Sequence, residues 1–292
     1  MKMADSEDEE IEVLRKELCW LLEDQVHPVL EEIRNTLLEC CRRFPHRSTQ
    51  DEHDPAVETT DDTPSYRCLG RVGIDGDNEL LNVIYVMINC YILFTGSGTG
   101  NVYCVVTLLG DSICDADINF KHKQGKDHHT FKTGINPEVN WKLQQIQDAG
   151  NFLYGALSVF ANIDKDKKFT SAKQVLMLLD TLMNYLNQGR SCLAFPKRKS
   201  VDELVNNRNM TTFKPPVPSD VALSFYIHSS KLILALYNLQ VTNQQKIEIT
   251  SRSQVECTVQ WLNEAVMLFT LALQQCSQLK DKITVLQQYE IT

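Results

Sequence analysis

The sequence lacks the features that would place it in several large classes of protein. It has no apolar run of the roughly 20 residues that a membrane-spanning helix needs. Basic residues are not in excess, since the formal net charge is −9, and nucleic acid is therefore not expected as a partner. The first residues, MKMADSEDEE, are acidic and lack the apolar core of a secretory signal, so we expect a cytoplasmic protein.

Cysteine is present, but not in a spacing typical of ligands. The ten cysteines are scattered along the chain, and no two of them form a C-x-x-C pair. Several fall on apolar positions of expected helices or strands, as buried and reduced thiols of a cytosolic protein do. The spacing predicts neither a disulfide framework nor a zinc site.

Motifs for catalysis and nucleotide binding are missing as well. Neither G-x-S-x-G nor H-E-x-x-H occurs. The glycines Gly96–Gly100, in GSGTG, resemble a phosphate loop, but the next residues indicate a strand where a dinucleotide site needs a helix. The lysine of a P-loop is absent too. We expect a hairpin turn here and predict no catalytic residue, no cofactor and no metal ligand.

Two polar clusters have suitable residue types for a cation but too few ligands. Asp115 and Asp117 alternate along one expected strand, so they share a face that we expect to be solvated. His122, His128 and His129 flank the turn KQGKD without an evident third ligand from elsewhere, which predicts exposed hairpin residues.

Helical patterns occupy both ends of the chain. Residues 6–44 repeat apolar positions at helical spacing, and Ser6 with Glu9 predicts a capping box at the start. Pro28 interrupts this pattern and predicts a kink or a break near Gln25–His27. The acidic segment 48–65 indicates a linker, and the short β-rich runs of 66–134 indicate an antiparallel meander.

Helices are expected again in the second half. Residues 136–189 predict helices that begin after Asn136-Pro137 and end at Gly189, which resembles a C-terminal cap. Residues 190–218 indicate an irregular or extended segment that includes the basic stretch FPKRKS. Residues 219–292 predict bundle helices, the first through ALSFYIHSSKLILALYNLQ and the last from VECT onward, separated by a short strand in QKIEIT.

The last helix carries a heptad-like apolar seam, which indicates either the core face of a bundle helix or a coiled coil with another copy. The seam consists of Leu262, Ala265, Phe269, Ala272, Cys276, Leu279, Ile283 and Leu286. The expected fold is α+β: an elongated helical bundle formed by the N- and C-terminal helices, plus an inserted antiparallel β domain.

Several stretches of the sequence resemble the Rogdi family of leucine-zipper-domain proteins. They are CWLLEDQVHPVLEEI, LGDSICDADINFK, WKLQQIQDA, PSDVALSFYIHSSKL and VECTVQWLNEAVMLFTLALQQCSQLKDKI. The resemblance runs in order from about Leu18 to Tyr289 and leaves Leu69–Asn89 without a counterpart, so we interpret those residues as an insertion or a variant exon. It also places Pro28 where the family carries a small residue.

The resemblance implies a role without catalysis. Rogdi-like proteins are counterparts of a subunit of the RAVE complex, which promotes assembly of the vacuolar proton ATPase and so acidifies organelles. The implied partners are a large DMX-like WD-repeat scaffold and soluble-sector subunits of that ATPase. These partners would recruit the chain to endosomal, lysosomal or synaptic-vesicle membranes, consistent with the family's link to neuronal function. The resemblance leaves open whether the chain forms a homodimer and whether part of it is nuclear. The alternative function is that of a self-associating coiled-coil protein unrelated to the ATPase.

Overall fold

The computed structural model describes residues 2–44, 90–94, 102–124, 127–135, 139, 141–164 and 168–290. It combines α-helices with antiparallel sheets, so the predicted mixture of these two elements is confirmed. The chain divides into two compact units. The helical unit comprises Met1–Arg43, Asp148–Phe195 and Gln260–Thr292, and the sheet unit comprises Phe44–Gln147 and Pro196–Val259.

The N-terminal helix is interrupted next to its proline. α1 (Lys2–Trp20) continues through a π-helical turn, η1 (Leu21–Gln25), into α2 (Val26–Cys41). Pro28 donates no backbone hydrogen bond, and its ring crowds the carbonyl four residues back. The π turn widens the helix at that carbonyl. The predicted interruption is therefore confirmed. The predicted capping box at Ser6 is wrong, because the acidic residues that favour a helix N-terminus extend α1 back to Lys2.

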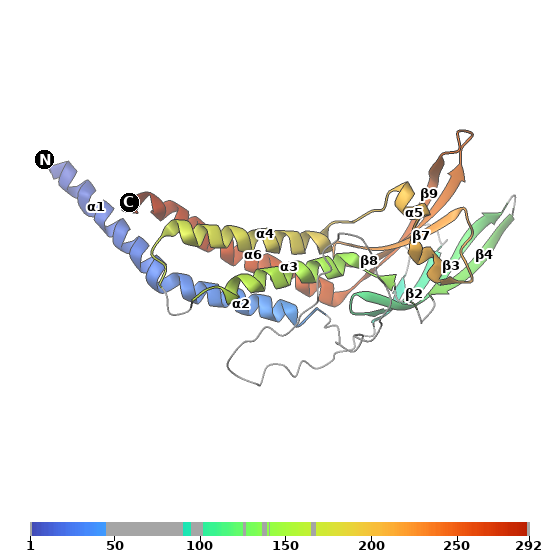
Figure 1. The fold of residues 1–292 in the computed structure, drawn as a ribbon, viewed down its shortest axis with the longest axis horizontal. Coiled ribbons are helices and arrows are strands. Elements are labelled where there is room, and N and C mark those ends of the chain that lie inside the picture. The colour runs from blue at the N-terminus through green and yellow to red at the C-terminus, as the bar shows by residue number, and fades with distance from the viewer. Residues whose placement is uncertain are drawn as a thin grey trace, which may run out of the picture. The chain divides into compact units, whose positions relative to one another are not determined.

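Four further helical segments complete this unit. They are α3 (Gln144–Ala161), whose first turn belongs to the sheet unit, α4 (Ala172–Ala194), α6 (Gln260–Leu286) and η4 (Gln287–Tyr289). Helix α6 packs against both α2 and α4 (Figure 1). Ser171 occupies the N-cap position of α4, but its side chain makes no capping bond. Instead the Ala172 N–H donates to Oε1 of Glu290, 3.1 Å away.

Two predicted helix boundaries are wrong. Helix α3 begins at Gln144 because Trp141–Lys142 forms a short strand, β5, that pairs with Ser112 and Ile113 of β3. The expected start at 136–137 lies outside the described residues. Helix α4 passes through Gly189 and ends at Ala194, because the glycine allows a close approach of another helix and does not form a cap.

The larger sheet is the predicted antiparallel meander. Its strands are β1 (Cys90–Phe94), β2 (Val102–Leu109), β3 (Ser112–Gln124), β4 (Asp127–Ile135) and β6 (Phe213–Lys214), in the order β1-β2-β3-β4-β6. Gly110 has a positive φ of 64° in the two-residue turn between β2 and β3, the conformation that a type II′ turn requires at its first position.

The smaller sheet replaces a predicted helix. β7 (Val221–His228), β8 (Lys231–Val241) and β9 (Ile247–Thr258) pair antiparallel in that order. Seven consecutive residues of β7 are buried, so the strand shows no alternation of apolar and polar residues and its sequence resembles a buried helix. Ser229 and Ser230 form the turn with positive φ angles, without the glycine that usually marks such a hairpin. β9 also includes VECT, which was expected to begin the last helix.

The smaller sheet is covered on both faces within its unit. On one face, Trp141 contacts Phe213 and Phe225, with ring centroids 5.7 and 5.3 Å apart. On the other face, Leu204 of α5 (Val201–Val205) packs against β7 and β8. α5 and the 3₁₀ turn η3 (Arg208–Thr212) occupy part of the segment that was expected to be irregular. This double coverage explains why β7 is apolar throughout.

Some sequence expectations fall on residues outside the described part of the chain. These are the linker 48–65, the interpreted insertion 69–89 and the glycine turn 96–100. The residues after the glycines do form a strand, β2, and β1 pairs with it antiparallel, as a hairpin requires. Within the described ranges, no helix is both long and apolar enough to cross a bilayer.

Candidate interaction surfaces

All eight residues of the predicted seam lie on one face of α6 and are buried within the chain. Six of them are fully inaccessible, and Leu279 and Leu286 are 3% and 8% exposed. Their neighbours in the helical unit are α2 and α4. The seam therefore packs intramolecularly, and a second copy could reach it only if the helices separated.

Glycine determines how closely α4 packs against α6. A Cβ atom at Gly189 would lie 2.7 Å from Cε1 of Phe269, a distance that side-chain carbons do not tolerate. Gly155 of α3 meets the ring of Tyr185 in the same way, at 2.6 Å. These contacts indicate a closely packed interior in the helical unit.

Ion pairs lie at the edges of the helix contacts. Nε of Arg43 donates to Glu264 at 3.1 Å, and a second contact joins Arg43 to Glu39. The hydrogen bond from Arg43 holds the pKa of the Glu39 carboxyl below its ordinary value. Lys280 donates to Asp180 at 2.6 Å between α6 and α4. Because these groups are largely exposed, they fix register more than they stabilise the fold.

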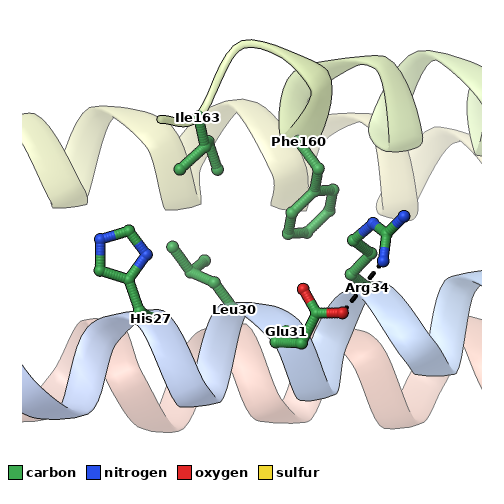
Figure 2. A pocket seen from close by; sticks show the side chains of 6 residues that line it. All are labelled: His27, Leu30, Glu31, Arg34, Phe160 and Ile163. Atoms are coloured by element: carbon green, nitrogen blue, oxygen red, sulfur yellow. Dashed lines mark hydrogen bonds and ion pairs between the residues drawn. The ribbon is translucent and has the colours of Figure 1, made fainter. Parts of the chain in front are cut away.

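A small pocket lies between α2 and the end of α3. His27, Leu30, Glu31 and Arg34 approach it from α2, and Phe160 and Ile163 close it from the other side (Figure 2). Arg34 donates to Glu31 at 3.0 Å, so its charge is paired within the pocket wall. The cavity volume is about 50 Å³, far below that of a typical small-molecule site and enough for a water or two.

The thiols of the interior are not poised to react. Burial raises the pKa of Cys41 and of Cys276 to about 12, and it raises the pKa of Cys40 and Cys104 further. Sγ of Cys40 donates to the carbonyl of Ala265, 3.8 Å away, and so joins α2 to α6. These four cysteines are reduced, as the sequence predicts.

The sheet unit contains a larger apolar groove with a volume of about 790 Å³. Its walls include Val205, Met210, Pro216, Pro218 and Val241, from α5, η3, the loop after β6 and the end of β8. A groove of this size could accommodate a peptide segment or a small apolar ligand. Its lining offers few charged groups that could orient a polar substrate.

One edge of the smaller sheet is capped by a single side chain. The Gln145 amide is 5% exposed, and its Nε2 donates to the carbonyl of Ile227 at 3.0 Å. The Ile227 N–H donates back to Oε1 of Gln145 at 2.8 Å. The side chain thus makes the two hydrogen bonds of a neighbouring strand residue. Nearby, Asp111 accepts from Nε2 of Gln147 at 2.6 Å and from the Leu143 N–H at 2.7 Å.

Asp115 and Asp117 are exposed on one face of β3, so the predicted solvated face is confirmed. His122 and His129 are paired across the β3–β4 hairpin. The predicted exposure of the histidines is confirmed for His129 but wrong for His122, whose side chain is only 12% exposed and places Nε2 3.4 Å from Asp220. The side chain of His128 lies outside the described part of the chain. Among the residues that the structure describes, no group of three or more histidine, cysteine or acidic side chains is arranged to hold a metal.

Comparison with known proteins identifies the family. The family model described as "Rogdi leucine zipper containing protein" matches residues 17–283. The chain belongs to the Rogdi family. It is 36% identical to "Protein rogdi" of Drosophila melanogaster over 291 residues, which cover 99% of this chain and 95% of that protein. It is 30% identical to "Protein rogdi homolog" of Homo sapiens over 302 residues, which cover 95% and 93% of the two chains.

Two of the stretches that indicated the Rogdi family make contacts inside the sheet unit. WKLQQIQDA supplies Gln145, which bonds to Ile227, and Gln147, whose partner Asp111 comes from LGDSICDADINFK. Neither the edge cap nor the apolar groove was expected from the sequence. The clue to the groove was KPPVP, which indicates extended chain with apolar side chains.

Proposed function

We propose that this chain is a non-enzymatic adaptor of a complex that promotes assembly of the vacuolar proton-pumping ATPase. Membership in the Rogdi family over nearly the whole chain is the observation that carries the proposal. The ATPase, the DMX-like WD-repeat scaffold and the soluble-sector partners come from what the resemblance implies. Catalysis plays no part in this role, and the chain acts through protein contacts and reaches membranes through its partners.

The surfaces described above are compatible with such a role. The helical unit has a closely packed interior with only a small pocket between α2 and α3, and the sheet unit offers an apolar groove and exposed strands. In this proposal the helices of the two chain ends form the elongated bundle of the adaptor, and the sheets form its inserted domain. The cytoplasm is the proposed compartment.

Affinity purification of the tagged full-length chain from its native cells tests the proposal. Mass spectrometry should find a WD-repeat scaffold together with soluble-sector ATPase subunits, and loss of the chain should raise organelle pH while ATPase subunit levels stay normal. A comparison is the same tag on Phe269→Ala, which removes a fully buried ring and should reduce the recovery of partners by destabilising the helical unit. Recovery of no ATPase subunit together with normal acidification would overturn the proposal.

A self-associating protein is the second candidate. The observation that favours it is an exposed apolar pair on α6, Met267 and Leu271, which are 63% and 46% accessible and one turn apart. Light scattering of the purified chain measures its oligomeric state and so tests self-association. A dimer that Met267→Lys/Leu271→Lys converts to a folded monomer would support self-association through this pair, and a monomeric wild-type chain would exclude it.

A further inference from the structure

The β3–β4 hairpin is basic in an otherwise acidic chain. Residues 121–132 carry four lysines against a single aspartate, whereas the whole chain has a formal net charge of −9, with histidine counted as neutral in both cases. Lys121 and Lys132 are exposed, and neither forms an ion pair with a residue that the structure describes. A local charge of this sign attracts an acidic ligand.

Strand pairing places these charges on one face of the sheet. Lys121 pairs with Thr130 and Lys132 pairs with Asn119. Because paired residues share a face and Asn119 is two residues from Lys121, both lysines project from the same side, as diagonal neighbours. This is the solvated face, and it also carries Asp117, which pairs with Gly134.

The outer edge of β4 is open. Its only neighbour on that side in the described part of the chain is β6, which pairs with Gly134 and Ile135 alone. Thr133 is buried, and its Oγ1 donates to the carbonyl of Pro215 at 2.7 Å, so the open part of the edge is residues 127–132. No strand of the described ranges lies beside these residues on the side opposite β3. Such a row of N–H and C=O groups is a template for an added strand, which proteins otherwise protect.

We propose that the β4 edge, residues 127–132, binds an extended acidic segment of a partner protein as an additional strand of the larger sheet. This inference rests on the proposed adaptor role, because it names one surface through which the adaptor takes a partner. Backbone pairing with β4 supplies the affinity, and acidic side chains placed beside Lys132 and within reach of Lys121 supply the selectivity.

The charges along the hairpin also define where the acidic residues of the partner lie. The lysines lie toward the tip of the hairpin, and Asp115 and Asp117 lie on the same face farther along β3. An acidic side chain is attracted at the tip half and repelled near the two aspartates. The bound segment is therefore acidic where it meets Lys132 and neutral or basic where it approaches β6.

A peptide fits this surface better than a membrane does. An acidic bilayer would use the lysines but would leave the amides and carbonyls of the β4 edge without partners. The described residues of this edge also lack the exposed aromatic or aliphatic cluster that inserts into lipid, since His129, Thr130 and Lys132 are its exposed side chains.

Binding of a defined probe to the purified full-length chain tests the proposal. The probe is a fluorescent octapeptide of alternating Glu and Thr, and the readouts are fluorescence anisotropy and amide hydrogen exchange of β4. The control peptide has the same sequence with every second amide N-methylated, which keeps the charge and removes the donors of one edge. Lys121→Glu/Lys132→Glu is the test variant, and Lys142→Glu/Lys246→Glu makes the same change in charge at exposed sites elsewhere in the sheet unit.

We expect the octapeptide to bind, to slow amide exchange at 127–132 and to lose about tenfold in affinity with the test variant but not with the control variant. The N-methylated peptide should bind the wild-type chain at least about tenfold more weakly than the unmodified peptide does. This comparison requires no variant of the protein. Equal binding of both peptides would overturn strand addition. Binding to phosphatidylserine vesicles with no slowed exchange at β4 would overturn it in favour of a membrane surface.

Purification from cells separates this inference from the adaptor role. If the Lys121→Glu/Lys132→Glu chain loses one partner and keeps the others, the β4 surface and the adaptor role are both supported. If it keeps every partner, the β4 surface is wrong and the adaptor role stands. If the wild-type chain recovers no partner but binds the octapeptide at β4, the adaptor role fails while the edge retains its strand-binding chemistry.

Discussion

Replacing Gln145 by leucine should destabilise the sheet unit. The Gln145 amide is buried and makes both hydrogen bonds to the backbone of Ile227. Leucine has a similar volume but no polar atom, so the change leaves the Ile227 N–H and carbonyl without their partner. Packing is nearly preserved, and the measured effect reports on the hydrogen bonds.

The magnitude follows from those two bonds. A buried backbone group left without a partner costs about 1–3 kcal/mol, and two such groups together give roughly 2–5 kcal/mol. Water that reaches the strand edge in the variant would bring the value toward the lower limit. Gln240→Leu is the matched control, because Gln240 is an exposed strand residue of the same unit and its loss should change the free energy of unfolding by less than about 0.5 kcal/mol.

Urea unfolding and amide exchange together decide the outcome. In urea, Gln145→Leu should lower the midpoint with an unchanged slope. By nuclear magnetic resonance, the Ile227 amide should lose its protection while amides at the centre of β8 keep theirs. A midpoint equal to that of Gln240→Leu, together with a protected Ile227 amide, would refute the edge-capping role.

Three further outcomes can be checked on the helical unit. Gly189→Ala should destabilise it by about 1–3 kcal/mol despite the higher helix propensity of alanine, because the new Cβ meets Phe269; a stabilised variant in urea unfolding would contradict this contact. Phe269→Ala should lower the free energy of unfolding by about 3–5 kcal/mol, and Met267→Ala should lower it by less than about 0.5 kcal/mol. If light scattering showed that the wild-type chain is a dimer and that Phe269→Ala is a folded monomer, the seam would instead lie between two copies. Burial raises the pKa of Cys41 and Cys276 from an ordinary value of 9.0 to about 12, so their contribution to stability is complete below pH 9.0 and is lost as pH rises toward about 12. Urea midpoints that stay constant over this range would show that both thiols are accessible.

The sequence predicts elements best where periodicity is strong and one face is buried. The repeat along α6 identified eight of the ten residues that the fold buries there, and it missed Trp261 and Leu273. β2 and β3 alternate in burial because one face of the larger sheet is solvated, and their runs were recognised as strands. Pro28 was sufficient to predict an interrupted helix, because a proline ring inside a helix always crowds the carbonyl of the preceding turn.

Prediction failed where tertiary contacts decide the local structure. β7 is covered on both faces, so its sequence lacks the alternation that distinguishes a half-buried strand from a helix. Gly189 is of the residue type that commonly ends a helix. Only the position of Phe269 on another helix shows that the glycine instead allows the two helices to pack closely. The partnership of Gln145 with Ile227 joins residues far apart in sequence, and no local pattern indicates it.

Two residues in the stretches that resemble Rogdi hold the sheet unit together. The Gln145 amide bonds to the backbone of Ile227, and the Asp111 carboxylate accepts hydrogen bonds from the side chains of Gln147 and Ser112. A side chain that is fully hydrogen-bonded inside the fold has nothing left to offer a partner. The resemblance therefore identifies the architecture, and the surfaces that select partners have to be sought among residues that the fold itself does not use. Lys121 and Lys132 meet that requirement, since they are exposed, unpaired among the described residues and adjacent to an open strand edge.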